Sequence, residues 1–154
     1  MASDKEIIFQ FLTILANEVK KNIQVVSGST RDSIEVVATE NEGSILAASY
    51  IRTLEDGRPP TRTGAPKGNP TLAESIKSWI TAKGIIPTGI SVDSLAFLIA
   101  RKIHREGNLL FRSGGKSGVL SNVFTQSRID AFAETFAGKY QSLVSSEVLK
   151  SYQV

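Results

Sequence analysis

The sequence predicts an α+β fold in which helices pack on one face of a small antiparallel sheet. Apolar residues recur at helical spacing in four separate stretches of the chain. Between the first two of these stretches lies a segment rich in β-branched and small residues, with a turn sequence in its middle. The expected order is therefore an N-terminal helix, a strand pair, two central helices and a long C-terminal helix. A chain of 154 residues suits one domain, residues 1–154.

The first helix is expected at about residues 4–22. Ser3 is a suitable N-cap, and Glu6 three residues later completes the pattern of a capping box. The apolar residues that follow fall on one helical face: Ile8, Phe11, Leu12, Leu15 and Val19.

A β-hairpin is expected at about residues 33–53. Its strands would be 33–39 and 44–53, joined by Glu40-Asn41-Glu42-Gly43, in which Asn and Gly suit a tight reversal. The pair Val25-Val26 could add a short strand or form a loop edge.

Two strands alone rarely make a stable sheet. Either a third strand lies near 109–111 or 118–120, or the hairpin pairs with another chain and the sheet is completed on assembly. The second alternative points to oligomerisation.

Two central helices and a closing helix complete the fold. The first begins after Thr71 and ends at Gly84, with Leu72, Ile76, Trp79 and Ile80 on one face. Trp79 is expected in the core. The second runs from about Val92 to Arg105, with a stripe of Leu95, Leu98, Ile99 and Ile103. The closing helix has the clearest pattern: Ile129, Phe132, Ala133, Phe136, Tyr140, Leu143 and Val144.

Basic residues gather in the middle of the chain. Residues 51–116 hold 11 Lys and Arg against 5 Asp and Glu, whereas residues 1–50 hold 4 against 7. The middle also contains the prolines, so we expect long, basic, Pro/Gly-rich loops at about 55–70 and 107–118. Such loops are either solvated linkers or segments ordered by a neighbouring subunit.

The residue inventory argues against an enzyme. There is no cysteine, and the single histidine, His104, has no acidic neighbour in sequence except Glu106. Gly114-Gly115-Lys116-Ser117 resembles the end of a phosphate-binding loop, but the first glycine that such a loop needs is replaced by Leu110. We therefore expect no catalytic residue, no cofactor and no metal.

The N-terminus lacks the basic region and the uninterrupted apolar region of a signal peptide, and no run approaches the roughly 20 apolar residues that span a bilayer. We expect a soluble protein that does not enter a membrane. The basic middle, with a pI near 9.3, leaves open a small cytosolic DNA-binding or regulatory module, although no motif for sequence readout is present.

Three segments carry a resemblance to a known family. They are Tyr50 through Leu54-Glu55-Asp56-Gly57-Arg58-Pro59-Pro60, then Trp79-Ile80 before Lys83-Gly84-Ile85, then residues 95–103 with Gly107. Together they resemble the tail-completion and neck (head-tail joining) proteins of tailed bacteriophages. Gly118-Val119-Leu120 and Val123-Phe124 take the place of the family's valine-phenylalanine segment before the closing helix.

The resemblance implies a structural virion protein that is made in the host cytoplasm and forms a ring in the neck or tail. Its partners would be copies of itself, portal or connector proteins and tail proteins, with non-specific contact to DNA in the channel. The expected subunit or partner contacts are residues of the two loops and their edges: Arg52, Arg58, Pro59, Pro60, Arg62, Lys67, Arg112 and Lys116.

Overall fold

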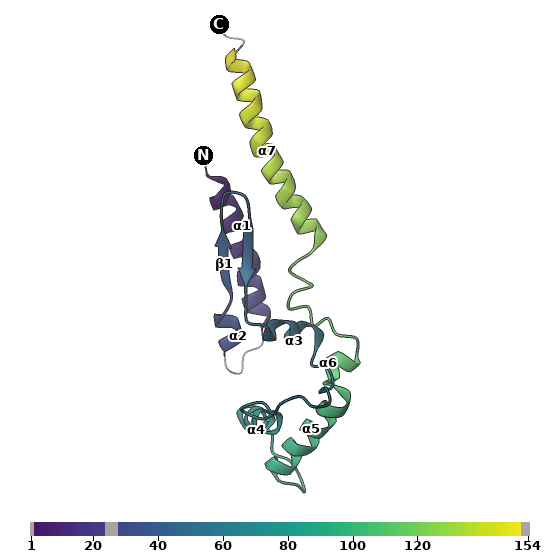
Figure 1. Ribbon diagram of the computed structural model, residues 1–154. Coiled ribbons are helices and arrows are strands. Elements are labelled where there is room, and N and C mark those ends of the chain that lie inside the picture. Colours follow the sequence, from purple (N-terminus) through teal and green to yellow (C-terminus); the bar gives the residue numbers. More distant parts are fainter. Residues whose placement is uncertain (1, 24–27, 152–154) are drawn as a thin grey trace.

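The computed structural model describes residues 2–23 and 28–151, and its fold is α+β, as the sequence predicts. In chain order the elements are α1 (Asp4–Asn22), α2 (Ser29–Asp32), β1 (Glu35–Ala38), β2 (Gly43–Leu46), α3 (Tyr50–Asp56), α4 (Leu72–Ala82), α5 (Val92–Glu106), α6 (Leu109–Arg112) and α7 (Gln126–Ser151). Figure 1 shows an elongated molecule, with α4 and α5 at one end and α7 reaching past the other. The possible strand at Val25-Val26 lies outside the described residues.

Helix α1 begins and ends where the sequence predicts. The Glu6 amide donates to Ser3 Oγ at 3.2 Å, and the Ser3 amide donates to Glu6 Oε2 at 2.8 Å, so the capping box is present. The helix buries Leu15, Ala16 and Val19. The apolar stripe thus faces a core.

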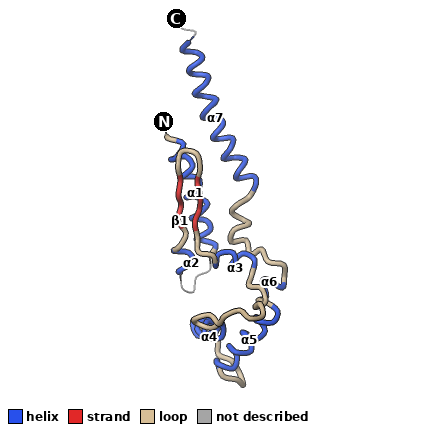
Figure 2. The backbone as a smooth tube through the Cα atoms, viewed as in Figure 1, coloured by secondary structure: helices blue, strands red, loops and turns tan. Residues whose placement is uncertain are grey.

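The β-hairpin covers that stripe. Strands β1 and β2 pair antiparallel, with Val36 opposite Ile45, and both of these side chains pack against the core that contains Leu15, Ala16 and Val19 of α1. Figure 2 shows the two strands lying alongside α1. On the outer face, the side chains of Val37 and Leu46 are 43% and 51% exposed. One face of the sheet therefore has no cover in this chain's described part.

The prediction that the second strand continues to Thr53 is wrong. The strand ends at Leu46, and residues 50–56 form α3. Strand β1 begins only at Glu35, opposite Leu46, so a longer β2 would have no partner for its backbone groups. A helix satisfies those groups locally, and this outweighs the strand preference of the β-branched residues.

Of the two alternatives for completing the sheet, a third strand in this chain is wrong at both candidate positions. Residues 109–112 form α6, so the segment 107–118 is not wholly a loop, and residues 118–122 form turns. Asn108 starts α6 because its side-chain oxygen accepts from the Phe111 amide at 2.9 Å. The described sheet has two strands.

Helices α4 and α5 pack on each other and form a second core. Its buried members are Ile76, Ile80, Ala96 and Ala100. Thr71 and Glu74 form a capping box that starts α4, and both helices match their predicted ranges. Trp79 is 42% exposed, so its predicted core position is wrong. Leu98, on the predicted apolar stripe of α5, is 52% exposed. Because α4 packs mainly against one helix, α5, only part of its apolar stripe is buried.

Two glycines set the geometry where α3 and α5 end. Gly57 and Gly107 have φ of +84° and +81° with ψ of 169° and 173°, a backbone region that is essentially restricted to glycine. A Cβ on Gly57 would lie 2.3 Å from the Phe111 amide nitrogen, and one on Gly107 would lie 2.8 Å from the Arg58 carbonyl oxygen. The two helix ends therefore approach more closely than any side chain would allow.

Hydrogen bonds fix this crossing. The Asn108 amide donates to the Arg58 carbonyl at 2.9 Å, and the Arg58 amide donates to Asn108 Oδ1 at 3.1 Å. The Thr61 amide donates to the His104 carbonyl at 2.9 Å. The segment after α3 is thereby tied to the end of α5.

Through its carboxylate, Glu55 ties a third segment, residues 117–121, to this crossing. It is 7% exposed, and its carboxylate accepts from the amides of Leu120 (2.8 Å) and Ser121 (3.3 Å) and from Ser117 Oγ (3.3 Å). Burial raises the pKa of Glu55, but these hydrogen bonds outweigh it and hold the pKa below its ordinary value of 4.5. We call residues 55–58, 107–108 and 117–121 the joint.

Replacing Gly57 with alanine tests the close approach in the joint. We expect Gly57→Ala to lower the free energy of unfolding by about 3 kcal/mol or more, because it adds a clash to an unfavourable φ. Gly64→Ala is the matched control, since Gly64 has φ of +79° but no atom near its Cβ position, and it should cost about 1 kcal/mol. Urea unfolding followed by circular dichroism measures both; equal losses would contradict the clash.

Removing the charge of Glu55 tests the carboxylate in the joint. At pH 7 we expect Glu55→Gln to destabilise the fold by about 2 kcal/mol, because two amides and a hydroxyl lose a charged acceptor. The folded-state pKa is depressed, so this stabilisation exists above pH 4.5 and disappears as the pH falls through the lower value. Urea unfolding of both chains from pH 7 to pH 3 should therefore converge. Asp56→Asn, at an exposed neighbour, is the control.

Candidate interaction surfaces

A basic groove lies between the loop that follows α3, the start of α4 and one side of α5. It encloses about 690 Å³. Its cations are Arg58, Lys67 and Arg101, with His104 beside them, and none of the described residues that line it is Asp or Glu. An anionic group would gain favourable electrostatic energy throughout this groove, which we call the basic groove.

Two aromatic rings give the basic groove an apolar side. Tyr50 and Phe97 line it, and they are 57% and 60% exposed. Pro66, Pro70 and Leu72 add apolar wall. The groove suits a ligand that combines acidic groups with apolar ones.

The joint positions one wall of the groove. Arg58 follows Gly57, and its guanidinium lies 3.4 Å from Thr61 Oγ1. The same hydroxyl is 2.6 Å from His104 Nδ1 on α5. Arg58 is therefore held half-buried at the groove edge, unlike a free loop arginine.

The structure brings two of the eight predicted contact residues, Arg58 and Lys67, into the groove. Pro59 and Pro60 lie exposed beside Arg58. Arg52 is exposed on α3, and Arg62 is exposed in the loop, where its carbonyl accepts from the Ala65 amide at 3.1 Å. These last four residues do not line the groove.

The other two predicted contacts, Arg112 and Lys116, also do not line the groove. Arg112 is on α6 and is paired with Glu106 at 3.7 Å. Lys116 is exposed with φ of +63°, in the glycine-rich turn that resembles a phosphate-binding loop. That turn serves the joint, since the Ser117 amide donates to the Glu55 carbonyl at 2.9 Å. Of its glycines, Gly115 has a structural use, because its φ is +72° and a Cβ there would lie 3.0 Å from the Asp56 carbonyl oxygen.

Sequence reasoning missed the contribution of α5 to the groove. Phe97, Arg101 and His104 occur at spacings of 4 and 3 residues, which places them on one helix face. This face adjoins the buried stripe of Ala96 and Ala100, and Ala100 also lines the groove. The periodicity was therefore visible, but only the fold shows that the loop carrying Lys67 lies opposite it.

Helix α7 is attached to α1 along its first half. The helices run antiparallel, because Arg128 pairs with Glu18 at 2.6 Å and the Phe132 ring stacks on Phe11 with centroids 4.2 Å apart. None of the described residues of α7 is buried. The attachment is therefore a surface contact.

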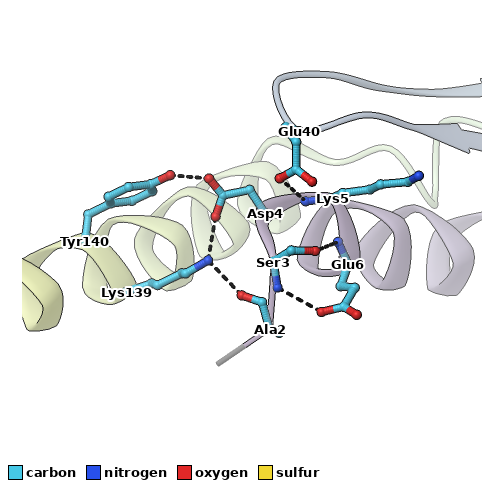
Figure 3. Close-up of polar contacts among 8 residues, drawn as sticks. All are labelled: Ala2, Ser3, Asp4, Lys5, Glu6, Glu40, Lys139 and Tyr140. Carbon is cyan, nitrogen blue, oxygen red and sulfur yellow. Dashed lines mark hydrogen bonds and ion pairs between the residues drawn. The ribbon is translucent and has the colours of Figure 1, made fainter.

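A polar clamp closes this contact at the start of α1 (Figure 3). Lys139 Nζ lies 2.5 Å from Asp4 Oδ1 and also donates to the Ala2 carbonyl at 2.9 Å, while the Tyr140 hydroxyl donates to Asp4 Oδ2. Hydrogen bonds from Lys139 and then Tyr140 lower the pKa of Asp4, and the Asp4 carboxylate raises the pKa of Tyr140.

Beyond the clamp, residues 141–151 of α7 extend past α1, and we call this segment the α7 overhang (Figure 1). Its apolar residues are uncovered: Val144, Val148 and Leu149 are 62%, 48% and 65% exposed. Apolar positions that would normally face a partner thus face solvent in the single chain.

No group of three potential metal ligands occurs among residues 2–23 and 28–151, and no described helix is long and apolar enough to cross a membrane. No family model, curated protein or solved structure matches this chain.

Neutralising Asp4 tests the clamp. We expect Asp4→Asn to increase amide hydrogen exchange in residues 128–140, because α7 loses the acceptor for Lys139 and Tyr140. The depressed pKa of Asp4 means that the clamp acts above the ordinary pKa of 3.8 and weakens as the pH falls through the lower value. Glu147→Gln, which removes an exposed pair on the overhang, is the control. Identical exchange in both variants would contradict a role for the clamp.

Proposed function

We propose that this protein is a structural subunit of a tailed-bacteriophage particle, which forms a ring in the neck or tail and acts by packing against copies of itself and its neighbours. The observation that carries the proposal is the uncovered apolar surface. In the described residues, large apolar side chains that are at least 40% exposed outnumber the buried apolar ones. Exposed apolar side chains that share one face of an element are typical of interaction surfaces, and Val144 with Val148 on α7 and Val37 with Leu46 on the outer face of the hairpin are such pairs.

The hairpin supports an assembled state. In the described sheet each strand has one partner, so the outer edges of both β1 and β2 present unpaired backbone groups. Two-stranded sheets are marginal by themselves. A neighbouring chain that added a strand or covered Val37 and Leu46 would complete the sheet.

The resemblance to neck and tail-completion proteins is the reason for proposing a tailed-bacteriophage particle. The segments around residues 50–60, 79–85 and 95–107 resemble neck and tail-completion proteins, whose rings join portal or connector proteins to the tail. A ring between the head and the tail transmits force through complementary protein surfaces, and this function needs no catalytic group. We assign the virion as the site of action on this basis.

The basic groove favours one alternative, a small cytosolic DNA-binding or regulatory module. Arg58, Lys67 and Arg101 would then contact phosphates, and DNA affinity would fall steeply with salt because counterions are released. Titration of a labelled duplex at 50 and 200 mM salt tests this alternative. Binding in the micromolar range with such a salt dependence would favour it over the structural role.

The α7 overhang provides a direct test of assembly. We expect the wild-type chain to form a discrete closed oligomer by light scattering, and Val144→Asp with Val148→Asp to raise its dissociation constant at least about tenfold. Ser142→Asp with Ser146→Asp adds the same charge on the opposite face of the helix and is the matched control. A monomer at every concentration would contradict a ring that forms by itself.

A further inference from the structure

The tip of the β-hairpin and the basic groove carry opposite charge, although Lys5 lies next to the tip on α1. The tip of the β-hairpin holds Glu40 and Glu42, and residues 33–51 contain no Lys or Arg. The basic groove holds three cations, and the described residues that line it include no acid. Figure 1 places the hairpin tip at the end where α1 begins and the α4–α5 pair at the other end.

The carboxylates at the tip have little to bind within the chain. The Glu40 carboxylate accepts from the Lys5 amide at 3.4 Å, and Figure 3 draws no other contact to this carboxylate. Glu42 is exposed. The groove cannot reach them in the same copy, because the body of the molecule lies between. Complementary surfaces at opposite ends of one chain instead meet between copies, head to tail.

We propose that the hairpin tip of one copy docks in the basic groove of the next, so that Glu40 and Glu42 face Lys67 and Arg101. This inference rests on the proposed ring function and names its contact. The contact is heterologous, so repeated docking closes into a ring when the rotation between copies closes and otherwise makes a filament.

The apolar surfaces match as well as the charges. On the outer face of the hairpin, Val37 is exposed near the tip, and the groove exposes Tyr50 and Phe97. An acidic loop with an apolar side chain beside it would cover both kinds of lining. A groove of about 690 Å³ lies within the range of about 300–1,000 Å³ typical of pockets that enclose a small ligand or a few residues.

Duplex DNA fits the same lining less well. Its backbone offers phosphates but no apolar group for the two rings, and its bases are stacked inside. Single-stranded nucleic acid could stack bases on Tyr50 and Phe97, as in other basic, aromatic grooves. That occupant is therefore the competing outcome in the test below.

Charge reversal tests the docking. We make a tip variant, Glu40→Lys with Glu42→Lys, and a groove variant, Lys67→Glu with Arg101→Glu; all four positions are exposed. Each variant alone should lose self-association by roughly a hundredfold or more, because like charges then face each other. An equimolar mixture should assemble again, since each reversed tip now meets a reversed groove. Light scattering and native mass spectrometry at low salt follow all four samples.

Matched controls separate a specific contact from a change in net charge. Asp32→Lys with Glu134→Lys mirrors the tip variant, and Lys21→Glu with Lys83→Glu mirrors the groove variant, all at exposed positions away from both surfaces. These controls should assemble as the wild type does. Circular dichroism confirms that every variant is folded.

A crosslink provides a second readout, and the absence of cysteine makes it clean. Asn41→Cys in one chain and Lys67→Cys in another should join as a heterodimer with a short bis-maleimide. Replacing the first partner with Glu134→Cys should abolish the product. Equal crosslinking by both pairs would overturn the docking.

The outcomes distinguish the two proposals. If the wild type assembles but the reversed variants assemble equally well, the docking is wrong and the ring function stands. If the wild type never assembles, both are overturned. If the groove variant assembles normally but no longer binds a labelled single-stranded oligonucleotide that the wild type binds, the groove is a nucleic-acid site and the docking is wrong.

Discussion

The joint between the ends of α3 and α5 is the constraint on which the rest of the structure depends. The chain leaves the α1–hairpin body at Gly57 and returns to it after Gly107, and both positions need a backbone conformation that only glycine adopts readily. Asn108 and Glu55 then tie three segments of chain together. The α4–α5 pair has a core of its own, so the joint is what fixes its position relative to the body.

The remaining parts of the fold are held with unequal strength. The first core buries α1 side chains against the hairpin and Val123, whereas α7 contributes no buried residue among those described. A ring stack and a few ion pairs attach α7 to α1. Contacts of this kind are individually weak in water, so α7 should open at a lower free energy than α1. Such an element is suited to adjust when a neighbour arrives.

Charge and apolar exposure are the two observations on which the proposed assembly role rests. The acidic hairpin tip and the basic groove lie far apart in one chain, so in the proposed ring they would orient an approaching copy before contact. Exposed rings and aliphatic side chains then supply the area that charge alone does not. In a closed ring every copy uses both ends, so contacts that are modest individually act together.

The sequence by itself determined the features that depend on neighbours along the chain. Ser3 with Glu6, and Thr71 with Glu74, fixed two helix starts because a capping box closes within four residues. Helical periodicity likewise predicted α5 and α7. The tertiary structure decided the rest: residues 50–56 became a helix because β1 offers no pairing there, and Glu55 became buried because residues 117–121, more than sixty positions away, supply its donors. The basic groove depends on the same folding, since Lys67 and Arg101 meet across a turn of chain that no local pattern specifies.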